Sequence, residues 1–345
     1  MAAENDKQTL LAWLQTALEL ELATIPPYLV ALLSIQLPGN RASAEIIRSV
    51  MMEEMLHLVL VANVLNAVGG APRIDEAAIP SYPLHLEFQG KPFADRQFLI
   101  DLAPFSGATI STFLKIELPH RPPQPELLEA ALVVPAPTIG EFYGRIIALL
   151  TELDGQEPLF VGDPARQIGE DFYWSGGGRI IKVNDLASAK AALDLVIRQG
   201  EASPAPADSA EANLGHPFAM GHYFRFREIE AGHRFVEGDN PYGEPTGESL
   251  AVDYTAVYPI MVSPKSSSYP EGSALAGLNR VFNQRYTAML QEIEQGLNGV
   301  PKALYTAIMD GMHGLPPVAH EMMKLVADGD AHGRTGCPTF EWLPA

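Results

Sequence analysis

Apolar positions near the N-terminus follow the spacing of two long helices. Between residues 10 and 35 they recur at positions 10, 11, 14, 18, 25, 28 and 32, which lie on one helical face. Pro26-Pro27 interrupts this pattern, so we expect the first helix to kink or restart there. A second apolar stripe runs from Ser43, an N-cap candidate, to Val68, and Gly69-Gly70-Ala71-Pro72 ends it. The two helices are expected to form an antiparallel hairpin.

The remaining pattern predicts more helices, separated by segments rich in proline and glycine. Thr138 is a candidate N-cap for a third long helix over residues 139–154. The Gly176-Gly177-Gly178 turn predicts a short strand over 180–183. Residues 202–212, rich in Ser, Pro, Ala and acid, are expected to be disordered. Other helices are predicted over residues 95–102, 106–118, 188–199, 217–237, 275–297 and 302–328, the last broken at Pro316-Pro317.

These elements predict a mainly α fold, an antiparallel four-helix bundle over residues 1–237. Inserts are expected at about 72–137, which is rich in proline, and at 155–187, which contains the short strand. Residues 238–345 are expected to form a loop and helical extension packed on the bundle.

Composition and charge narrow the class of protein. Of the 345 residues, 47% are hydrophobic and 19% are charged, which is typical of a globular chain rather than a polytopic membrane protein. The formal charge of −19 repels nucleic-acid phosphates and anionic lipid headgroups, so neither partner is expected. The longest uncharged stretch, residues 22–40, is broken by prolines, and we expect no membrane-spanning helix.

Cysteine usage and the N-terminus favour a cytoplasmic protein. Cys337 is the only cysteine, so no internal disulfide can form, and zinc sites built from several thiolates are excluded. The first residues are polar and acidic, whereas a secretory signal would be basic and then apolar. We therefore expect a reducing, intracellular location.

The most informative motif is Glu54-x-x-His57 in the second helix. Its two side chains lie three residues apart on a face that is otherwise apolar. Burying a carboxylate and an imidazole costs several kcal/mol unless they are paired, and a metal ion is an efficient partner. Glu-x-x-His is also the helix signature of di-iron and di-manganese bundles. A solvated or hydrogen-bonded pair is the alternative interpretation of the motif by itself.

Glu21 strengthens the metal interpretation. It falls on the inward face of the first helix, whereas Glu19 lies away from that face. If the hairpin turns near residues 37–42, Glu21 and the Glu54-x-x-His57 motif both lie about 18–24 Å from the loop, at about 1.5 Å per residue. The three side chains are therefore expected to meet at one level.

Two further glutamates and one histidine would complete a four-Glu, two-His site for two iron ions, with manganese as the alternative. The candidates are Glu141 at the start of the third helix, Glu201 at the end of the fourth, and His222. A second Glu-x-x-His, Glu230 and His233, competes with Glu201 and His222, although neighbouring charged residues favour a surface ion-pair network there.

Several of these segments resemble one family. The runs Glu19-Leu-Glu21-Leu-Ala-Thr-Ile-Pro-Pro-Tyr28, Glu53-Glu-Met-Leu-His57, Thr138-Ile-Gly-Glu-Phe-Tyr143, Gln199-Gly-Glu201 and His222-Tyr-Phe-Arg-Phe-Arg-Glu228-Ile are similar to the ferritin-like family named for iminophenylpyruvate dimer synthase. Its relatives form a domain in the enzymes that couple oxidised tryptophan units in violacein and indolocarbazole biosynthesis. The resemblance implies a metal-binding ferritin-like bundle. The sequence departs from the family pattern at Ala202, where a second glycine is expected.

Together these features predict a di-iron carboxylate oxidoreductase. It would use O2 or peroxide to oxidise a small organic substrate, plausibly derived from an amino acid. Manganese-dependent peroxide dismutation and a non-catalytic metal-binding role are the alternatives, and a homodimer is left open. Candidate supporting residues are Tyr28, Tyr143 and Tyr223 around the metals, with His120-Arg121 and Arg225 as candidate contacts for a substrate carboxylate.

Overall fold

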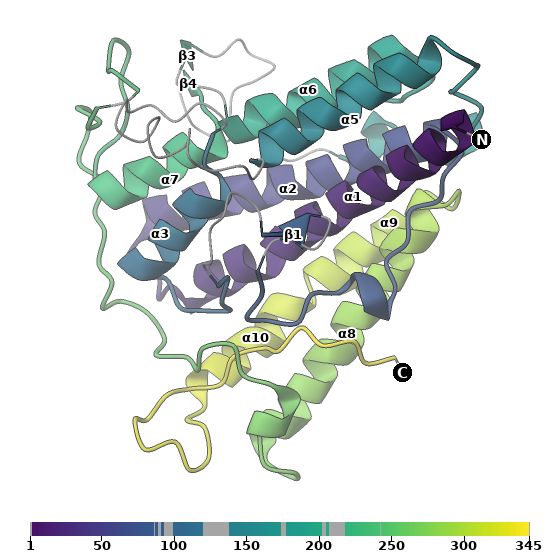
Figure 1. The fold of residues 1–345 in the computed structure, drawn as a ribbon. Coiled ribbons are helices and arrows are strands. Elements are labelled where there is room, and N and C mark those ends of the chain that lie inside the picture. Colours follow the sequence, from purple (N-terminus) through teal and green to yellow (C-terminus); the bar gives the residue numbers. More distant parts are fainter. Residues whose placement is uncertain are drawn as a thin grey trace.

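Two long antiparallel helices, α1 (Ala2–Ser34) and α2 (Arg41–Ala67), form the centre of the molecule (Figure 1). They pack along each other more extensively than any other pair of described elements. The computed structural model describes residues 2–85, 87–88, 91–92, 99–119, 138–173, 177–201, 205–206, 218–241 and 243–344.

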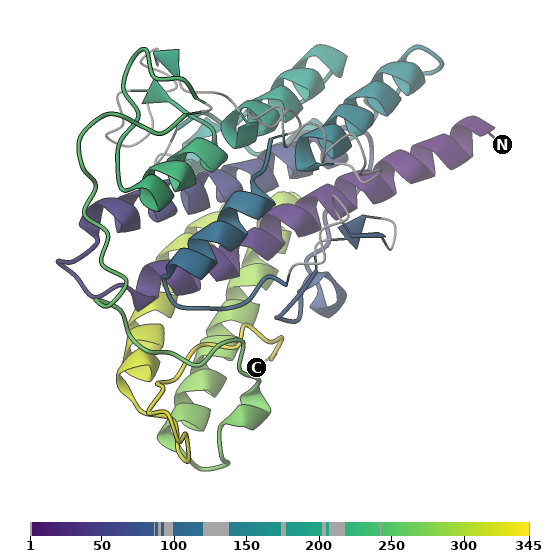
Figure 2. The same ribbon diagram turned by 60° about the vertical axis from the view of Figure 1, so that its left-hand side comes forward.

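Shorter helices cover this central pair on two opposite sides (Figures 1 and 2). On one side α5 packs on α1, α6 packs on α2, and α3 packs on α7; on the other side α8 contacts α2 and α10 contacts α1. The helices are α3 (Gly107–Ile116), α5 (Ile139–Asp154), α6 (Leu186–Glu201), α7 (His222–Ala231), α8 (Ala274–Leu297), α9 (Ala303–Thr306), a π-helical turn (Ala307–Met312) and α10 (Leu315–Lys324).

The first layer completes a four-helix bundle whose third and fourth helices are each interrupted. In both views α3 and α5 follow one another along one side of the central pair, and α6 and α7 follow one another beside them (Figures 1 and 2). The third helix of the bundle consists of α3, which ends at Ile116, and α5, which begins at Ile139; the fourth consists of α6, which ends at Glu201, and α7, which begins at His222. The predicted mainly α, ferritin-like bundle with additional C-terminal helices is confirmed.

The first helix runs without a break through Pro26 and Pro27, so the predicted restart there is wrong. Proline has no N–H, and Pro27 therefore leaves the carbonyl of Ala23 without its usual intrahelical donor. The hydroxyl of Tyr82, from the loop after α2, donates to this carbonyl at 2.7 Å. The lost helical hydrogen bond is thus replaced by one from a distant part of the chain.

Both central helices are apolar enough, by length and composition, to cross a membrane. However, 72% of the apolar window in α1 and 83% of that in α2 are buried inside the protein. A helix that is covered on several sides needs an apolar surface all round. Their hydrophobicity therefore follows from their position between the two layers.

Several predicted boundaries differ from the structure. The predicted strand over 180–183 is extended loop, and no strand lies there. Helix α7 ends at Ala231 rather than near 237, because Gly232 takes a left-handed conformation at its C-terminus. Residues 99–102, the described part of the predicted helix over 95–102, are not helical, and Ile100 forms a bridge with Leu84. The described strands form two small antiparallel pairs, β1 (Glu87–Phe88) with β2 (Lys91–Pro92) and β3 (Ala205–Pro206) with β4 (Phe218–Ala219).

Helix caps and breaks account for other differences. Helix α2 begins after Asn40, in a left-handed conformation, whereas Ser43 is buried inside the helix. The predicted helix over 302–328 breaks at the π-helical turn and Gly314, and its prolines begin α10, where a missing N–H costs little. Ser106 and Thr138 cap α3 and α5 through their side chains. Most of the expected disordered segment 202–212 lies outside the described residues.

One buried amide of α2, that of Asn63, holds the segment between α5 and α6 at two places. Asn63 donates to the carbonyls of Ile168 and Ile181, each at 2.9 Å, and its carbonyl oxygen accepts from the Ile168 N–H at 2.9 Å. The side chain is fully buried. Irregular backbone packed against a helix needs such partners, since unpaired buried amide groups are costly.

We expect Asn63→Ala to lower the free energy of unfolding by about 2–4 kcal/mol, because three backbone groups lose their partner in a buried setting. Urea unfolding of the two proteins measures the change. The exposed Gln291 on α8 supplies the control, since Gln291→Ala should change stability by no more than about 0.5 kcal/mol. Equal effects of the two substitutions would contradict this role of Asn63.

Candidate metal centre

Five buried metal-ligand side chains converge where the third and fourth helices of the bundle are interrupted. Each is at most 9% exposed. Helix α1 supplies one, α2 supplies two from a single turn, and the other two lie at the ends of the interrupted helices, directly after α3 and at the first residue of α7. They are Glu21, Glu54, His57, Glu117 and His222.

These side chains form two overlapping triplets, each with ligand atoms within 4.8 Å of one another. In the first triplet, His57 Nδ1 lies 3.2 Å from Glu21 Oε2 and 3.7 Å from Glu54 Oε1. In the second, His222 Nδ1 lies 2.9 Å from Glu54 Oε1 and 3.4 Å from Glu117 Oε2. Glu54 belongs to both triplets, so its carboxylate would be shared by two ions if one were bound in each.

Local helix geometry explains the first triplet. Glu54 and His57 are one turn apart on α2, and the neighbouring α1 brings Glu21 to the same level. The ring of His57 stacks on that of His222 from the second triplet, with centroids 5.3 Å apart and planes inclined by 19°. The second triplet depends on tertiary structure, since Glu117 and His222 reach the site only because α3 ends and α7 begins beside it.

Buried hydroxyl groups hold the carboxylates in place. Tyr28 donates to Glu117, and Tyr143 donates to Glu21. Thr24 Oγ1 donates to Glu54 Oε2 at 2.5 Å. The pKa values of both tyrosines lie well above the ordinary range, chiefly because of burial, with the nearby carboxylates adding to the effect. Both hydroxyls therefore stay protonated and act as donors.

The outer nitrogen of each histidine also has a partner. His57 Nε2 lies 3.0 Å from Gln199 Oε1, and His222 Nε2 lies 3.0 Å from Glu53 Oε2. Arg225 donates to the same oxygen of Glu53 at 2.6 Å. An acceptor at Nε2 favours a proton on that atom, so Nδ1 of each ring, which faces the carboxylates, is the nitrogen available to an ion.

The electrostatics of the group reflect an excess of negative charge. Burial, together with repulsion from Glu117 and Glu21, raises the pKa of Glu54 to about 7. Burial alone would lower the pKa values of both histidines, but the adjacent carboxylates raise them, that of His222 strongly. Burial likewise opposes ionisation of Glu53, but Arg225 and His222 lower its pKa below the ordinary value.

These residues fit a pair of metal ions. His222 Nδ1 is buried and has no directed hydrogen bond, although two carboxylates lie close to it. Three buried carboxylates face two imidazoles in the two triplets. Cations placed between them would relieve the carboxylate repulsion and use the free nitrogen, and a mixed Glu and His set suits iron or manganese.

A comparison with protein families agrees with this arrangement. A sequence model described as ferritin-like matches residues 14–231, which is more than half of the chain and includes all five clustered side chains.

The chain belongs to the ferritin-like family.

Two curated proteins are similar to this chain. Dichlorochromopyrrolate synthase from Lentzea aerocolonigenes is 25% identical over 318 residues, covering 84% of this chain and 29% of the synthase. The 2-imino-3-(indol-3-yl)propanoate dimerase from Chromobacterium violaceum is 27% identical over 384 aligned positions, covering 97% of this chain and 34% of the dimerase. This ferritin-like chain thus spans about a third of the length of these relatives, as the predicted resemblance to enzymes of that type implied.

A solved structure supports the fold. The crystal structure of a ferritin-like protein from Caulobacter vibrioides matches with a TM-score of 0.61 and 22% identity, covering 95% of this chain and 97% of that chain. The match extends over nearly the whole length of both chains, so the additional C-terminal helices are part of the shared fold.

Two of the six predicted ligands lie outside the group. The Glu141 carboxylate accepts from the Thr138 N–H at 2.8 Å, which completes a capping box at the start of α5. The Glu201 carboxylate packs against Gly140, where a side chain would clash with it. The structure brings Glu21, Glu54, His57 and His222 together, and it adds Glu117 in place of Glu141 and Glu201.

The structure also shows where the competing Glu-x-x-His pair and most of the candidate supporting residues lie. Arg227 pairs with Glu230 at the surface, and the exposed His233 contacts the Gly247 carbonyl at 3.1 Å, so neither reaches the metal centre. Tyr223 is half-buried and packs on Phe224. Arg225 is buried against Glu53 rather than open to a substrate. His120-Arg121 lies outside the described residues.

Three residues of the site escaped the sequence analysis. Glu117 lies at the end of the predicted helix over 106–118 and directly after the observed helix α3, but no spacing relates it to Glu54. Glu53 lies beside Glu54 in sequence, but its carboxylate forms an ion pair with Arg225. Gln199 lies in the Gln199-Gly-Glu201 run that carried the family resemblance, where the carboxylate drew attention instead of the amide.

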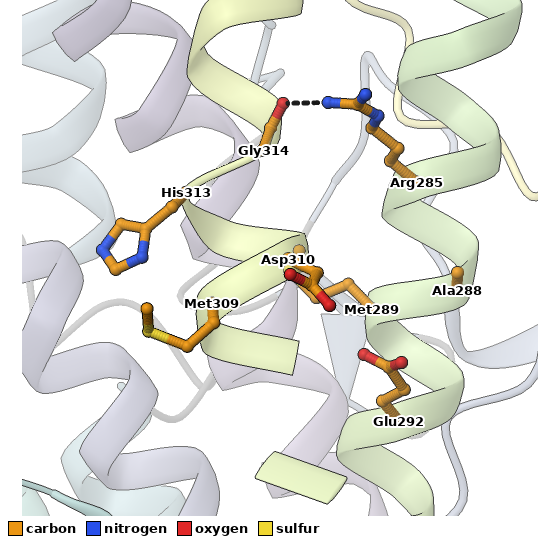
Figure 3. A pocket seen from close by; sticks show the side chains of 9 residues that line it. Arg285, Ala288, Met289, Glu292, Met309, Asp310, His313 and Gly314 are labelled. Atoms are coloured by element: carbon orange, nitrogen blue, oxygen red, sulfur yellow. Dashed lines mark hydrogen bonds between the residues drawn. The ribbon is translucent and has the colours of Figure 1, made fainter. Parts of the chain in front are cut away.

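A surface cleft of about 440 Å³ lies elsewhere, between α8 and the π-helical turn (Figure 3). Glu292 and Asp310 face each other across it, and Arg285 donates to the Gly314 carbonyl at 2.9 Å. Burial and the charge of Asp310 raise the pKa of Glu292. No residue of the candidate metal centre lines this cleft.

Stability of the metal-free protein should fall as pH rises from about 5 to 8. The pKa values of Glu54, His57 and His222 are all raised by folding, so the folded state binds more protons than the unfolded state. This stabilisation is complete below the unfolded pKa values and is lost as pH passes through the folded ones. Chemical unfolding of chelator-treated protein should show a loss on the order of 1–3 kcal/mol over that window.

The matched control is Glu54→Gln, which removes both a titrating group and the source of repulsion, and should flatten the pH dependence. Glu53 has the opposite sign, but its lowered pKa places its contribution below this window. A stability that increases from pH 5 to 8 would contradict the crowded-carboxylate description.

Proposed function

We propose that this chain is a di-iron carboxylate oxidoreductase that acts on a small organic substrate with O2 or peroxide. Glu21 and His57 would hold one ion, Glu117 and His222 the other, and Glu54 both. The observation that carries the proposal is Glu54, which is shared by two buried triplets that each contain one histidine Nδ1.

Two iron ions bound there would pass electrons from the substrate to O2 or peroxide. The protein's own part is to fix the ligands and exclude water. Tyr28, Tyr143 and Thr24 restrain one oxygen of each carboxylate, which leaves the other oxygen for an ion. Glu53 and Gln199 hold the proton of each histidine on Nε2. The buried setting strengthens each of these electrostatic contacts.

The relatives suggest a substrate class. One is named as a dimerase of 2-imino-3-(indol-3-yl)propanoate and the other as a synthase of dichlorochromopyrrolate. We propose an imino or amino acid with an aromatic side chain as the substrate of this chain. The chain corresponds to only about a third of each relative. The proposal therefore covers the oxidation of such a substrate and not the complete reaction of either enzyme.

Metal analysis tests the ligand set directly. Protein purified without chelator should contain about two metal ions per chain, and Glu54→Ala or His57→Ala should lose most of them. Glu117→Gln should lose about one ion, because only one triplet contains it. Elemental mass spectrometry gives these ratios.

The exposed His233 provides the control, since His233→Ala should keep the full metal content. Glu141→Ala should also keep it, because that carboxylate caps α5. Equal metal content in wild type, Glu54→Ala and His57→Ala would eliminate the proposed site.

Activity separates the candidate reactions. The iron-loaded protein should consume O2 or peroxide when 2-imino-3-(indol-3-yl)propanoate is generated in the assay, and Glu54→Gln should reduce the rate by about 100-fold or more. An oxygen electrode measures consumption. Native manganese with rapid gas release from peroxide would instead establish peroxide dismutation. No consumption with any reductant or indole-type substrate would favour a non-catalytic metal-binding protein.

A further inference from the structure

The two halves of the centre contain the same kinds of side chain but differ in the group that supports the histidine. Each half has one histidine Nδ1 and one glutamate that accepts from a buried tyrosine, and both share Glu54. The difference lies behind the histidines, because the amide oxygen of Gln199 contacts His57 whereas the carboxylate of Glu53 contacts His222. The two candidate ion sites therefore differ in the hydrogen-bond acceptor behind the histidine.

Both acceptors are fixed by further contacts. Gln199 donates its amide N–H to the Gly177 carbonyl at 3.1 Å, which turns its oxygen toward His57. Glu53 is fully buried and accepts from Arg225, whose guanidinium is held in turn by Ser49 Oγ and the Met220 carbonyl, each at 3.0 Å. Neither acceptor can turn away from its histidine without breaking these contacts.

A carboxylate and an amide act differently on the ring they contact. A carboxylate makes the stronger, charge-assisted hydrogen bond with an imidazole N–H and increases the basicity of the opposite nitrogen. An amide oxygen fixes the ring but draws the proton less strongly. Arg225 keeps Glu53 charged, and its second oxygen, Glu53 Oε1, has no hydrogen-bond partner. His222 is therefore the stronger donor of the two histidines.

We propose that Glu53 is a positioning residue that makes the His222 half of the centre the tighter ion site, so that the two ions bind in sequence, the first between Glu54, Glu117 and His222. This inference rests on the proposed function for the existence of two ion sites. It adds an order of loading and a chemical difference between the two ions.

Single-site variants of the full chain test it, with Co²⁺ as the probe. His57→Ala leaves the half supported by Glu53, and His222→Ala leaves the half supported by Gln199. Calorimetric titration should show that His57→Ala binds one Co²⁺ about 10–100-fold more tightly than His222→Ala, the range over which such supporting contacts change metal affinity. Visible absorption of the bound Co²⁺ should also differ between the two variants.

Glu53→Gln is then added to each background. It should weaken Co²⁺ binding about 10–100-fold and shift the absorption bands only in the His57→Ala protein. Gln199→Met is the matched substitution and should act only in the His222→Ala protein. A merely structural role of Glu53 would weaken both backgrounds alike, and circular dichroism melting identifies any variant that fails to fold.

Equal Co²⁺ affinities in the two single-site proteins, or equal weakening of both by Glu53→Gln, would overturn the inference while leaving the two-ion centre intact. A wild-type chain that binds no Co²⁺, iron or manganese would overturn the proposed function and this inference together. Two-step binding by the wild type, with the first step lost in His222→Ala, is the result expected.

Discussion

The structure depends on carboxylates that are buried close to one another. Glu21, Glu54 and Glu117 lie around two imidazoles in the interior of a helical bundle, where water cannot screen their charges. Such a group is unfavourable unless protons or cations balance it. Buried tyrosine hydroxyls donate to two of these carboxylates, and the two histidine rings stack beside them.

The bundle makes room for this group by interrupting two of its helices. Regular helices would bring residues to the centre only at the fixed intervals of a helical face. Because α3 stops and α7 starts there, Glu117 and His222 enter from helix ends, where the backbone is free to take other directions. The central hairpin supplies Glu21, Glu54 and His57, and the ends of the interrupted helices supply Glu117 and His222.

This division also explains what could be predicted from sequence. Glu21, Glu54 and His57 follow a helical period and a shared distance from the hairpin loop, so their meeting was predictable. His222 was also among the predicted ligands. Glu117, Glu53 and Gln199 reach the site through contacts between elements far apart in sequence, which no local spacing records. Glu141 shows the opposite error, since a glutamate three residues after a threonine serves a helix terminus as readily as a metal.

The hydrogen bond from Tyr82 to the carbonyl of Ala23 has a consequence for the metal centre. Ala23 lies between Glu21 and Thr24, which both touch the buried carboxylate group. The loop after α2 thus supports the backbone of α1 within one turn of two groups that shape the site. Loss of this hydrogen bond would leave that carbonyl unpaired and loosen α1 beside the candidate metal centre, so the loop after α2 is mechanically connected to the buried carboxylates.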